Sequence, residues 1–560
     1  MKLKRFSIGT LGLLAVSGLA WSCSSKSDDC NANLNCGPYG GGAFATSGAS
    51  GASGVSGTDG VSGAGATGAS GSSGTSGDGG SDSAAGTGGA PPPSCDGTSS
   101  PDVDACVISD KYGIFVSPTG DDNTANGTQA HPFATVTAAL ANVTTTIKHV
   151  YVCASDYNEP DTLVIPDRVS IYGGFTCDDG TWNYDSPLPA HLLPARAIGA
   201  TITDAKVGVV IQDVRIDAEN ADDGMGASSF GMMISGSHNI TLKRVEIRAG
   251  KGGKGSVGVD GATGLDGIAS GTDQNGMAAT CSNPPASRVG PQSVPKICGS
   301  QGGAGGTAAV GTDYAPAQDG GTGYLVSPTN GGKGGQVFGN SAIRGQDGDK
   351  GLLGDVGAAA PALGTFSAMG YNMASGGNGG LGKPGAGGGG GGASLGSATC
   401  LGATGGAGGM GGCGGDPGGG GIGGGASVAL LSWQSTVSID GCTLTANSGG
   451  AGGDGGKGHA GGVGKAGGIG GAADDGNTVG VGGDGGRGGN GGNGGNGAGG
   501  SGGPSVALVY DGTPPTQLGV SILNFASISA AAGKGGTLGA TANYGPDGSK
   551  GLTQGVYPKP

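Results

Sequence analysis

The sequence has few aromatic residues, few basic residues and almost no glutamate. Aromatics make up 4% of its 560 residues, whereas 139 residues are glycine. Glycine brings no side chain to bury and loses more backbone freedom on folding than any other residue, which excludes one large hydrophobic core for the whole chain. Lys and Arg number 27 against 41 Asp and Glu, and this net charge of -14 argues against a nucleic-acid partner.

The acidic residues are nearly all aspartate, since glutamate occurs only at Glu159, Glu219 and Glu246. Aspartate suits tight turns and the oxygen ligation of calcium. We expect no cofactor. Calcium is the one ion that this composition would suit. The acidic balance otherwise predicts a soluble surface that repels other copies of itself.

The first residues have the features of a secretory signal. A basic start precedes the apolar run Ile8–Ala20, which is too short to span a membrane stably. Leu19-Ala-Trp-Ser-Cys23 resembles a bacterial lipobox, and the resemblance makes Cys23 the lipid-attachment residue. We expect an exported protein with a signal peptide at 1–22, anchored by this lipid to the outer membrane or cell surface. Cleavage after Ala20 would instead give a freely secreted protein.

Twelve cysteines in an exported chain are expected to form mostly disulfides. Cys23 is set aside for the lipid, and Cys442 because it aligns with a core position of a repeat. The other ten form five local pairs: Cys30 with Cys36, Cys95 with Cys106, Cys153 with Cys177, Cys281 with Cys298, and Cys400 with Cys413. None of them has the Cys-x-x-Cys spacing of a zinc site.

Residues 23–108 are predicted to be a tether. Gly, Ser, Ala and Thr dominate residues 24–94, and glycine recurs at every third position from Gly48 to Gly63. Collagen shares this period but requires proline between the glycines, and proline is absent here. The composition favours a flexible chain that holds the folded part away from the membrane.

A stretch of about twenty residues recurs in the chain and predicts stacked units. Phe230–Ala249 aligns without gaps with Ser427–Ala446, 197 positions later, and with the end of Ala200–Ala218, 31 positions earlier. A fourth copy, Ser505–Ala530, needs extra turn residues. Apolar residues alternate with polar ones in each copy, which is the pattern of short strands with one buried face.

The offset of 31 residues allows a test of parallel stacking. Aligned residues of parallel, in-register strands lie about 4.8 Å apart, so their charges must be compatible. The outward positions pair opposite charges: Asp213 with Arg244, Arg215 with Glu246, and Asp217 with Arg248. Each such pair contributes a few tenths of a kcal/mol to about 1 kcal/mol. We interpret them as a structural ladder.

Tyr112–Leu140 is the most distinctive stretch of the chain. It predicts a strand, an Asp-rich turn and a short helix with Pro132 in its first turn. The stretch resembles the opening segment of right-handed parallel β-helix proteins of the pectin-lyase-like superfamily. This resemblance implies an all-β fold in which a short helix covers the first coil. We interpret His131 as a turn residue rather than a catalytic one.

Long glycine-rich segments interrupt the repeats. Residues 250–426 and 447–504 far exceed ordinary loops in length, and Gly482–Gly502 runs in regular groups of three. This period suits a polyproline-II-like helix, with two rows of bare backbone packed on neighbours and a third row of polar residues in water. We predict a bundle held by backbone hydrogen bonds between segments, with disorder as the alternative. The segments resemble the glycine-rich repeats of mycobacterial PGRS proteins.

The predicted fold is all-β, a right-handed parallel β-helix with long glycine-rich insertions. Its parts are a signal peptide (1–22), a tether (23–108), a cap with the first coils (109–249), an insertion (250–426), a coil (427–446), an insertion (447–504), a coil (505–530) and a tail (531–560).

Two functions suit this architecture. The first is a non-catalytic cell-envelope lipoprotein acting as a surface structural, adhesion or polysaccharide-binding module. Its partners would be the membrane, through the lipid, and polysaccharide or other surface proteins. The alternative is a polysaccharide lyase or glycoside hydrolase acting on acidic polysaccharide, with calcium as a possible cofactor.

Lyases with this fold use acidic residues to hold calcium and a Lys or Arg to remove a sugar proton. Lys243, Arg248, Asp217 and Glu219 could take such roles. Most of these residues already have a charge partner in the predicted ladder, so we assign no catalytic or metal-binding residue.

Overall fold

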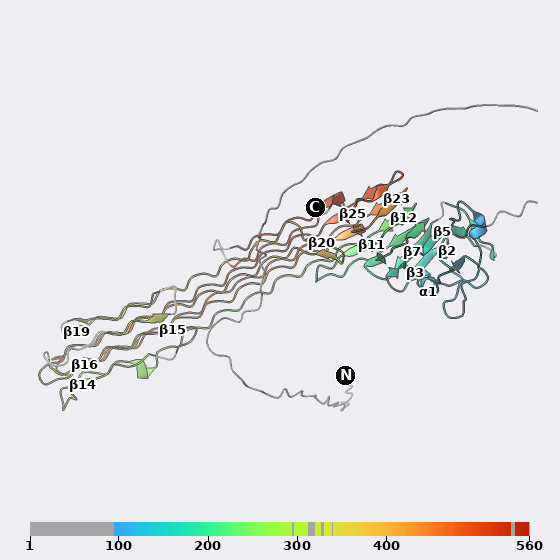
Figure 1. Ribbon diagram of the computed structural model, residues 1–560. Coiled ribbons are helices and arrows are strands. Elements are labelled where there is room, and N and C mark those ends of the chain that lie inside the picture. Colours follow the sequence, from blue (N-terminus) through green and yellow to red (C-terminus); the bar gives the residue numbers. More distant parts are fainter. Residues whose placement is uncertain are drawn as a thin grey trace, which may run out of the picture. The chain divides into compact units, whose positions relative to one another are not determined.

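The computed structural model describes residues 95–177, 180–186, 189–293, 296–311, 320–325, 330–338, 340–538 and 544–558. The predicted signal peptide, the lipid-attachment residue Cys23 and the tether up to residue 94 lie outside the described residues. The predicted disulfide between Cys30 and Cys36 also lies outside them, so that pairing stays a prediction. The described residues belong to one compact unit. It contains stacked strands and long glycine-rich segments (Figure 1).

The protein is mostly β, and three parallel sheets dominate it. Sheet 1 has the order β1 (Gly113–Val116), β2 (His149–Cys153), β5 (Ser170–Thr176), β9 (Val209–Gln212), β12 (Ile240–Lys243), β23 (Val437–Asp440) and β26 (Thr516–Gln517), with β6 (Asn183–Tyr184) antiparallel to β5. Sheet 2 has the order β3 (Asp156–Glu159), β7 (Ala190–Pro194), β10 (Val214–Asp217), β13 (Glu246–Arg248), β24 (Thr443–Thr445) and β27 (Ile522–Asn524). Sheet 3 has the order β4 (Leu163–Val164), β8 (Ile198–Thr203), β11 (Ser229–Ser235), β22 (Ser427–Trp433), β25 (Ser505–Asp511) and β28 (Thr553–Pro558).

The chain visits sheets 3, 1 and 2 in turn, and we call each such set of three strands a coil. β8, β9 and β10 form one coil, and β11, β12 and β13 form the next. The coil after that begins at β22, beyond the first glycine-rich insertion. Ile240 pairs with Val209 on one side and Val437 on the other, so both predicted offsets, 31 and 197, are confirmed.

The core lies between the three sheets. Alternate residues of each strand point inward and are buried in a single cluster, which includes Ile211, Leu242 and Ile439 from sheet 1, Ile216, Ile247 and Leu444 from sheet 2, and Ile202, Ile234 and Leu430 from sheet 3. Cys442 also lies in this core, as predicted. Each fully buried Leu or Ile side chain contributes about 1.5–3 kcal/mol. The period-two pattern of the sequence therefore encodes the stacking.

A short helix covers the first coil, as the sequence predicted. This helix, α1 (Val136–Ala141), buries Val136, Ala139 and Leu140. Its N-terminal amides donate to the Glu159 carboxylate, with Val136 N to Oε1 at 2.7 Å. Pro132 lies before the helix rather than in its first turn, so that detail was wrong. His131 forms a short bridge with Thr128, in agreement with its interpretation as a turn residue.

Residues 95–112, which include the end of the predicted tether, contact sheet 1. The short 3-10 helix η1 (Ala105–Val107) lies in this segment, and a disulfide joins Cys95 to Cys106. The Tyr151 hydroxyl donates to the Val107 carbonyl at 2.6 Å. Asp102 forms an ion pair with Lys243 of β12.

The central strands of sheet 3, β11, β22 and β25 (Ser505–Asp511), are buried on both faces. Their inner face joins the core, and their outer face carries a second apolar cluster that includes Phe230, Met233 and Leu431. A hairpin from the first insertion, β20 (Thr365–Ser367) and β21 (Gly370–Asn372), contributes Phe366 and Tyr371 to this cluster. The double burial explains the nearly continuous apolar run of β22.

The glycine-rich segments form a hydrogen-bonded bundle. The amides of Gly406, Gly409 and Gly412 donate to the carbonyls of Gly483, Gly486 and Gly489, and the same step of three continues along both segments. Comparable ladders join 374–392, 404–425, 449–471 and 482–503 to one another, in parallel and antiparallel directions (Figure 1). The predicted bundle with backbone bonds between segments is thus confirmed for the described residues.

Glycine is required in the bundle because of space. A Cβ atom added at Gly412 would lie 2.0 Å from the Gly462 carbonyl oxygen, and one at Gly486 would lie 2.0 Å from the Gln346 carbonyl oxygen. Two rows of 482–490 are buried glycine, while the third row, Asp484, Arg487 and Asn490, is exposed. This agrees with the predicted arrangement of rows.

Aspartate and asparagine side chains satisfy many bundle amides that have no backbone partner. The side-chain oxygens of Asn490, Asn493 and Asn496 accept from Gly464, Gly461 and Gly458. Asp260 Oδ1 accepts from Lys457 N at 2.7 Å, and Asp266 Oδ1 accepts from Val463 N at 2.7 Å. A short side chain with an oxygen at this reach explains why the acidic residues here are aspartate and not glutamate.

Two disulfides join distant parts of the first insertion. They are Cys281–Cys400 and Cys298–Cys413, with sequence separations of 119 and 115. The predicted local pairs, Cys281 with Cys298 and Cys400 with Cys413, are therefore wrong, because bundle packing brings segments far apart in sequence side by side. Cys95–Cys106 and Cys153–Cys177 form as predicted.

Short elements complete the described insertion. They are η3 (Thr272–Gln274) and the antiparallel pairs β14 (Ser287–Arg288) with β16 (Ala308–Ala309), β15 (Ser300–Gln301) with β17 (Tyr324–Leu325), and β18 (Val337–Phe338) with β19 (Ser341–Ala342). In the part of the chain that the structure describes, no helix is both long and apolar enough to cross a bilayer.

Candidate functional site on the first sheet

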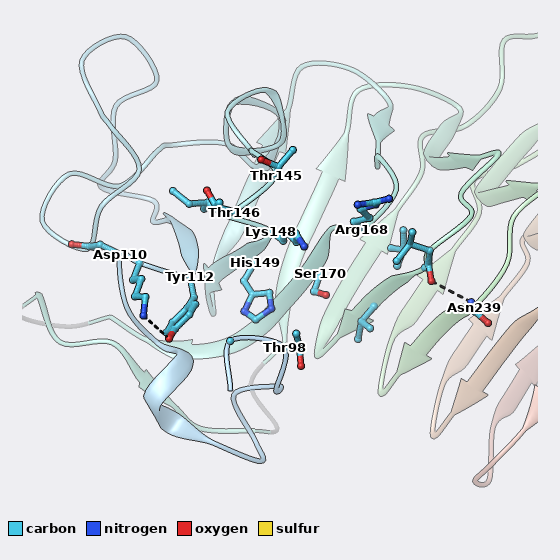
Figure 2. Close-up of a pocket in the computed structure, with 17 residues that line it drawn as sticks. Thr98, Asp110, Tyr112, Thr145, Thr146, Lys148, His149, Arg168, Ser170 and Asn239 are labelled. Atoms are coloured by element: carbon cyan, nitrogen blue, oxygen red, sulfur yellow. Dashed lines mark hydrogen bonds between the residues drawn. The ribbon is translucent and has the colours of Figure 1, made fainter. Parts of the chain in front are cut away.

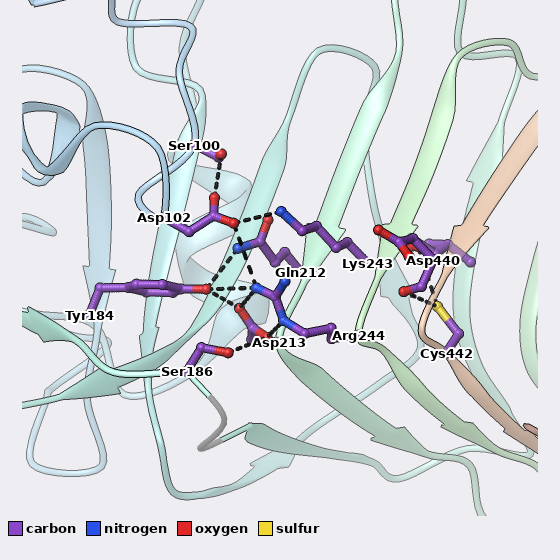
Figure 3. A network of polar contacts seen from close by, with 11 residues as sticks. Ser100, Asp102, Tyr184, Ser186, Gln212, Asp213, Lys243, Arg244, Asp440 and Cys442 are labelled. Carbon is purple, nitrogen blue, oxygen red and sulfur yellow. Dashed lines mark hydrogen bonds and ion pairs between the residues drawn. The ribbon is translucent and has the colours of Figure 1, made fainter. Parts of the chain in front are cut away.

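A polar network lies at the corner between sheets 1 and 2 (Figure 3). Arg244 binds the Asp213 carboxylate with two hydrogen bonds, of 2.6 Å from Nε and 2.8 Å from Nη2. The hydroxyls of Tyr184 and Ser186 also donate to Asp213, which is only 3% exposed. Asp213 and Arg244 occupy equivalent turns of successive coils, with φ of 54° and 52°. The network therefore joins two coils.

Asp102 attaches the N-terminal segment to this network. Its Oδ2 lies 2.5 Å from Lys243 Nζ and 3.8 Å from Arg244 Nη2. Burial acts to raise the pKa of Asp102, but hydrogen bonds from Lys243 and Ser100 outweigh it and lower this pKa to about 2. Asp102 is thus ionised and paired at neutral pH.

The outer face of sheet 2 carries the predicted charge ladder. Arg215 Nε lies 3.9 Å from Glu246 Oε2, and Arg248 Nε lies 3.9 Å from Asp217 Oδ1. Together with Arg244–Asp213, all three predicted stacked pairs are confirmed. His191, which the sequence did not single out, adds to the ladder because its two ring nitrogens lie 2.9 Å from Asp156 and 3.1 Å from Asp217.

The four residues considered for a lyase role do not converge. Lys243 lies on sheet 1 and is paired with Asp102, whereas Asp217 and Arg248 lie on sheet 2 and are paired with each other. Glu219 lies beyond the end of β10. Among the described residues, the one group with metal-ligand proximity is Cys95, Asp104 and Cys106, and its two cysteines form a disulfide.

A pocket of about 830 Å³ lies on the outer face of sheet 1 (Figure 2). Its floor is formed by residues of β2, β5 and β9, and its walls come from the N-terminal segment and from turns that precede these strands. The charged residues that line it are Asp110, Lys111, Lys148 and Arg168. The pocket is therefore cationic within a chain whose net charge is -14.

His149 forms part of the pocket floor and is 5% exposed. The Tyr151 hydroxyl uses its single proton for the Val107 carbonyl, so it accepts from His149 Nδ1, 2.9 Å away. This assigns the proton to Nδ1 and leaves Nε2 as an acceptor. Burial, together with the nearby charge of Lys148, lowers the pKa of His149 to about 4, so the ring is neutral at physiological pH.

Arg168 stands at an unusual position in the pocket wall. Its φ is 70°, and the equivalent turns of the next two coils hold Gly208 (φ 136°) and Asn239 (φ 56°). Gly and Asn tolerate this left-handed region, whereas other side chains there are strained. None of the pocket residues was predicted from the sequence, although an Arg aligned with a Gly and an Asn was a usable signal.

Among solved structures, the chain is similar to a rhamnogalacturonan lyase, with 16% identity and a TM-score of 0.14. The similarity covers 26% of this chain and 40% of the lyase chain. No protein-family model and no curated protein sequence matches the chain.

Proposed function

We propose that the three sheets are the faces of a right-handed parallel β-helix of the pectin-lyase-like kind. The constant order of the sheets in successive coils supports this proposal, as does the single core between the sheets. The helix α1 over the first coil matches the segment that carries the resemblance. Right-handedness follows the strong preference of crossovers between parallel strands.

The protein acts as an exported lipoprotein, held at the cell surface through Cys23. Four disulfides within the described residues support export, because disulfides are typical of oxidising compartments. The lipobox-like sequence supports the anchor. Mass spectrometry of the mature protein tests it, since a diacylglycerol thioether at Cys23 is expected and an unmodified N-terminus at Trp21 would refute it.

Its function is non-catalytic: a surface structural, adhesion or polysaccharide-binding module. The observation that carries this proposal is the charge pairing on sheets 1 and 2. A lyase needs several carboxylates free to bind calcium and a free base beside them. The carboxylates of Asp102, Asp213 and Asp217 at these faces are each paired with a cation of the same chain. The pocket is lined by one carboxylate, Asp110, which accepts from Gln129 N.

The test is incubation of the purified chain with a panel of neutral and acidic polysaccharides, with and without calcium. Retention of a polymer without cleavage is expected. Unsaturated sugar products, seen by ultraviolet absorbance, would show a lyase, and new reducing ends without that absorbance would show a hydrolase. Either product would overturn the non-catalytic proposal.

A further inference from the structure

The pocket on sheet 1 contains polar groups that the fold does not use. No hydrogen bond or ion pair joins the Lys148 ammonium to another described residue. Arg168 Nε lies 4.0 Å from Asp167, but Asp167 already accepts from the amides of Val207 and Gly208. These two cations line one pocket and lack the close partners that the other basic residues of the coils have (Figure 2).

The floor of the pocket adds a hydrogen-bond acceptor. His149 is 5% exposed, its Nδ1 is occupied by Tyr151, and its Nε2 has no partner among the described residues. The Ser170 hydroxyl lies beside it on the neighbouring strand, in register with His149. A ligand hydroxyl can donate to Nε2 while an acidic group of the same ligand contacts the cations.

The walls suit a sugar ring. The Tyr112 ring lines one side, and Lys111 Nζ lies 4.8 Å from the ring centroid. Thr98, Thr145 and Thr146 add hydroxyls around the rim. Pockets of this volume with an aromatic wall and a few polar groups are typical of small-ligand sites.

The conformation of Arg168 is a separate observation that favours a binding role. Arg168 lines the pocket from a turn where glycine or asparagine stands in the following coils. A strained residue persists where its side chain has a use that offsets the strain. Within the described residues, Arg168 has no ion pair closer than 4.0 Å that would give its side chain such a use.

We propose that this pocket binds one anionic sugar unit, with Arg168 and Lys148 on the acidic group and His149 Nε2 accepting from a ring hydroxyl. The acidic group can be a carboxylate or a phosphate. This inference rests on the proposed binding function and gives it a site and a ligand class. No bond of the ligand is broken.

The test uses the full chain with isotope-labelled histidine, whose ring signals are followed by NMR during titration with galacturonic acid, glucose 1-phosphate or galactose. We expect the His149 signal to shift with one or both acidic sugars and not with galactose. A shift with galacturonic acid alone identifies a carboxylate ligand, and one with the phosphate alone identifies a phosphate ligand. Equal shifts with galactose, or none with any probe, would overturn the proposal.

Variants separate binding from folding. Arg168→Gly places the most tolerant residue at φ 70°, so the chain keeps its fold while binding weakens by roughly tenfold or more. Lys148→Gln weakens binding in the same direction. Lys254→Gln removes an exposed charge of the first insertion and leaves binding unchanged. If Arg168→Gly binds the acidic sugar as tightly as wild type, the proposed site is wrong, even if the chain retains a polysaccharide. If the chain cleaves a polysaccharide, only the proposed non-catalytic function is wrong.

Discussion

The stacked coils and the glycine bundle both have a packed interior, but they bury different groups. The coils bury side chains such as Leu242 and Ile439 between three sheets. The bundle buries bare backbone, and its carbonyls and amides satisfy one another across segments. An additional side-chain carbon therefore stabilises the core of the coils and disrupts the packing of the bundle. The two regions should respond inversely to adding and removing a methyl group.

Adding one carbon inside the bundle should have the largest effect. Gly412→Ala places Cβ 2.0 Å from the Gly462 carbonyl oxygen, and neither backbone can move without breaking a ladder of hydrogen bonds. We expect a loss of more than about 3 kcal/mol, the upper end of overpacking effects. Hydrogen exchange should show lost amide protection in the bundle.

The matched control for this substitution is Lys457→Ala, on the exposed row of a neighbouring segment. Its amide still donates to Asp260, so protection should be retained. If Gly412→Ala exchanged like wild type, glycine would not be needed in the bundle for space, and the contrast between the regions would fail.

Removing carbon from the coils should have the next largest effect. Leu242 is fully buried in sheet 1, and Leu242→Ala should cost about 3 kcal/mol through lost burial and the cavity left behind. Exchange should rise across the three sheets. Thr241→Ala, one residue away on the outer face, should change stability by less than about 0.5 kcal/mol. Equal effects of the two substitutions would contradict the assigned facing of β12.

Protonation of His149 should produce a smaller, pH-dependent effect that originates in the coils. Its pKa is about 4 in the folded chain and 6.5 without perturbation, so the unfolded chain binds more protons between these values. Folded-state stability should therefore fall as pH drops from about 6.5 to 4, by on the order of 2 kcal/mol. Urea unfolding at several pH values measures this slope.

The comparison variant is His149→Gln, which should flatten the slope in that window. Tyr151 retains its bond to Val107 in this variant, so the floor of the pocket keeps one of its two polar contacts. A slope that survives unchanged in His149→Gln would mean that other groups titrate there and that His149 is not the source.

The two regions also differ in how much the sequence could predict. In the coils, aligned residues lie on top of each other, so the opposite charges of Asp217 and Arg248 were enough to predict their register. In the bundle, the period of three predicted the hydrogen bonding, but a repeated glycine carries no marker of which segments are neighbours. Cys281 was therefore paired with nearby Cys298 and not with Cys400.

The pocket could not be predicted because no single stretch encodes it. Tyr112, His149 and Arg168 come from separate segments that meet only when the coils stack. Asp102 was likewise hidden, because residues 95–108 were grouped with the tether and the contact of Asp102 with Lys243 spans 141 positions. The period-two pattern of a strand predicts on which face of the sheet a residue lies. It does not predict which side chains from distant segments lie on the same face.

The smallest predicted effect separates the two uses of glycine. None of the glycines in 376–392, 405–425, 449–471 or 482–503 lies in the left-handed region, so the bundle needs glycine for space and not for φ.

The turn at Arg168 is the reverse case, and Arg168→Gly should stabilise the chain by about 1 kcal/mol because the strain at φ 70° is removed. Thermal unfolding measures the gain. Asn239→Gly, at the equivalent turn, should gain less, since asparagine tolerates this region and its side chain bonds the Val207 carbonyl. A destabilised Arg168→Gly chain would show that the guanidinium supports the fold, which would remove the reason to assign it to a ligand.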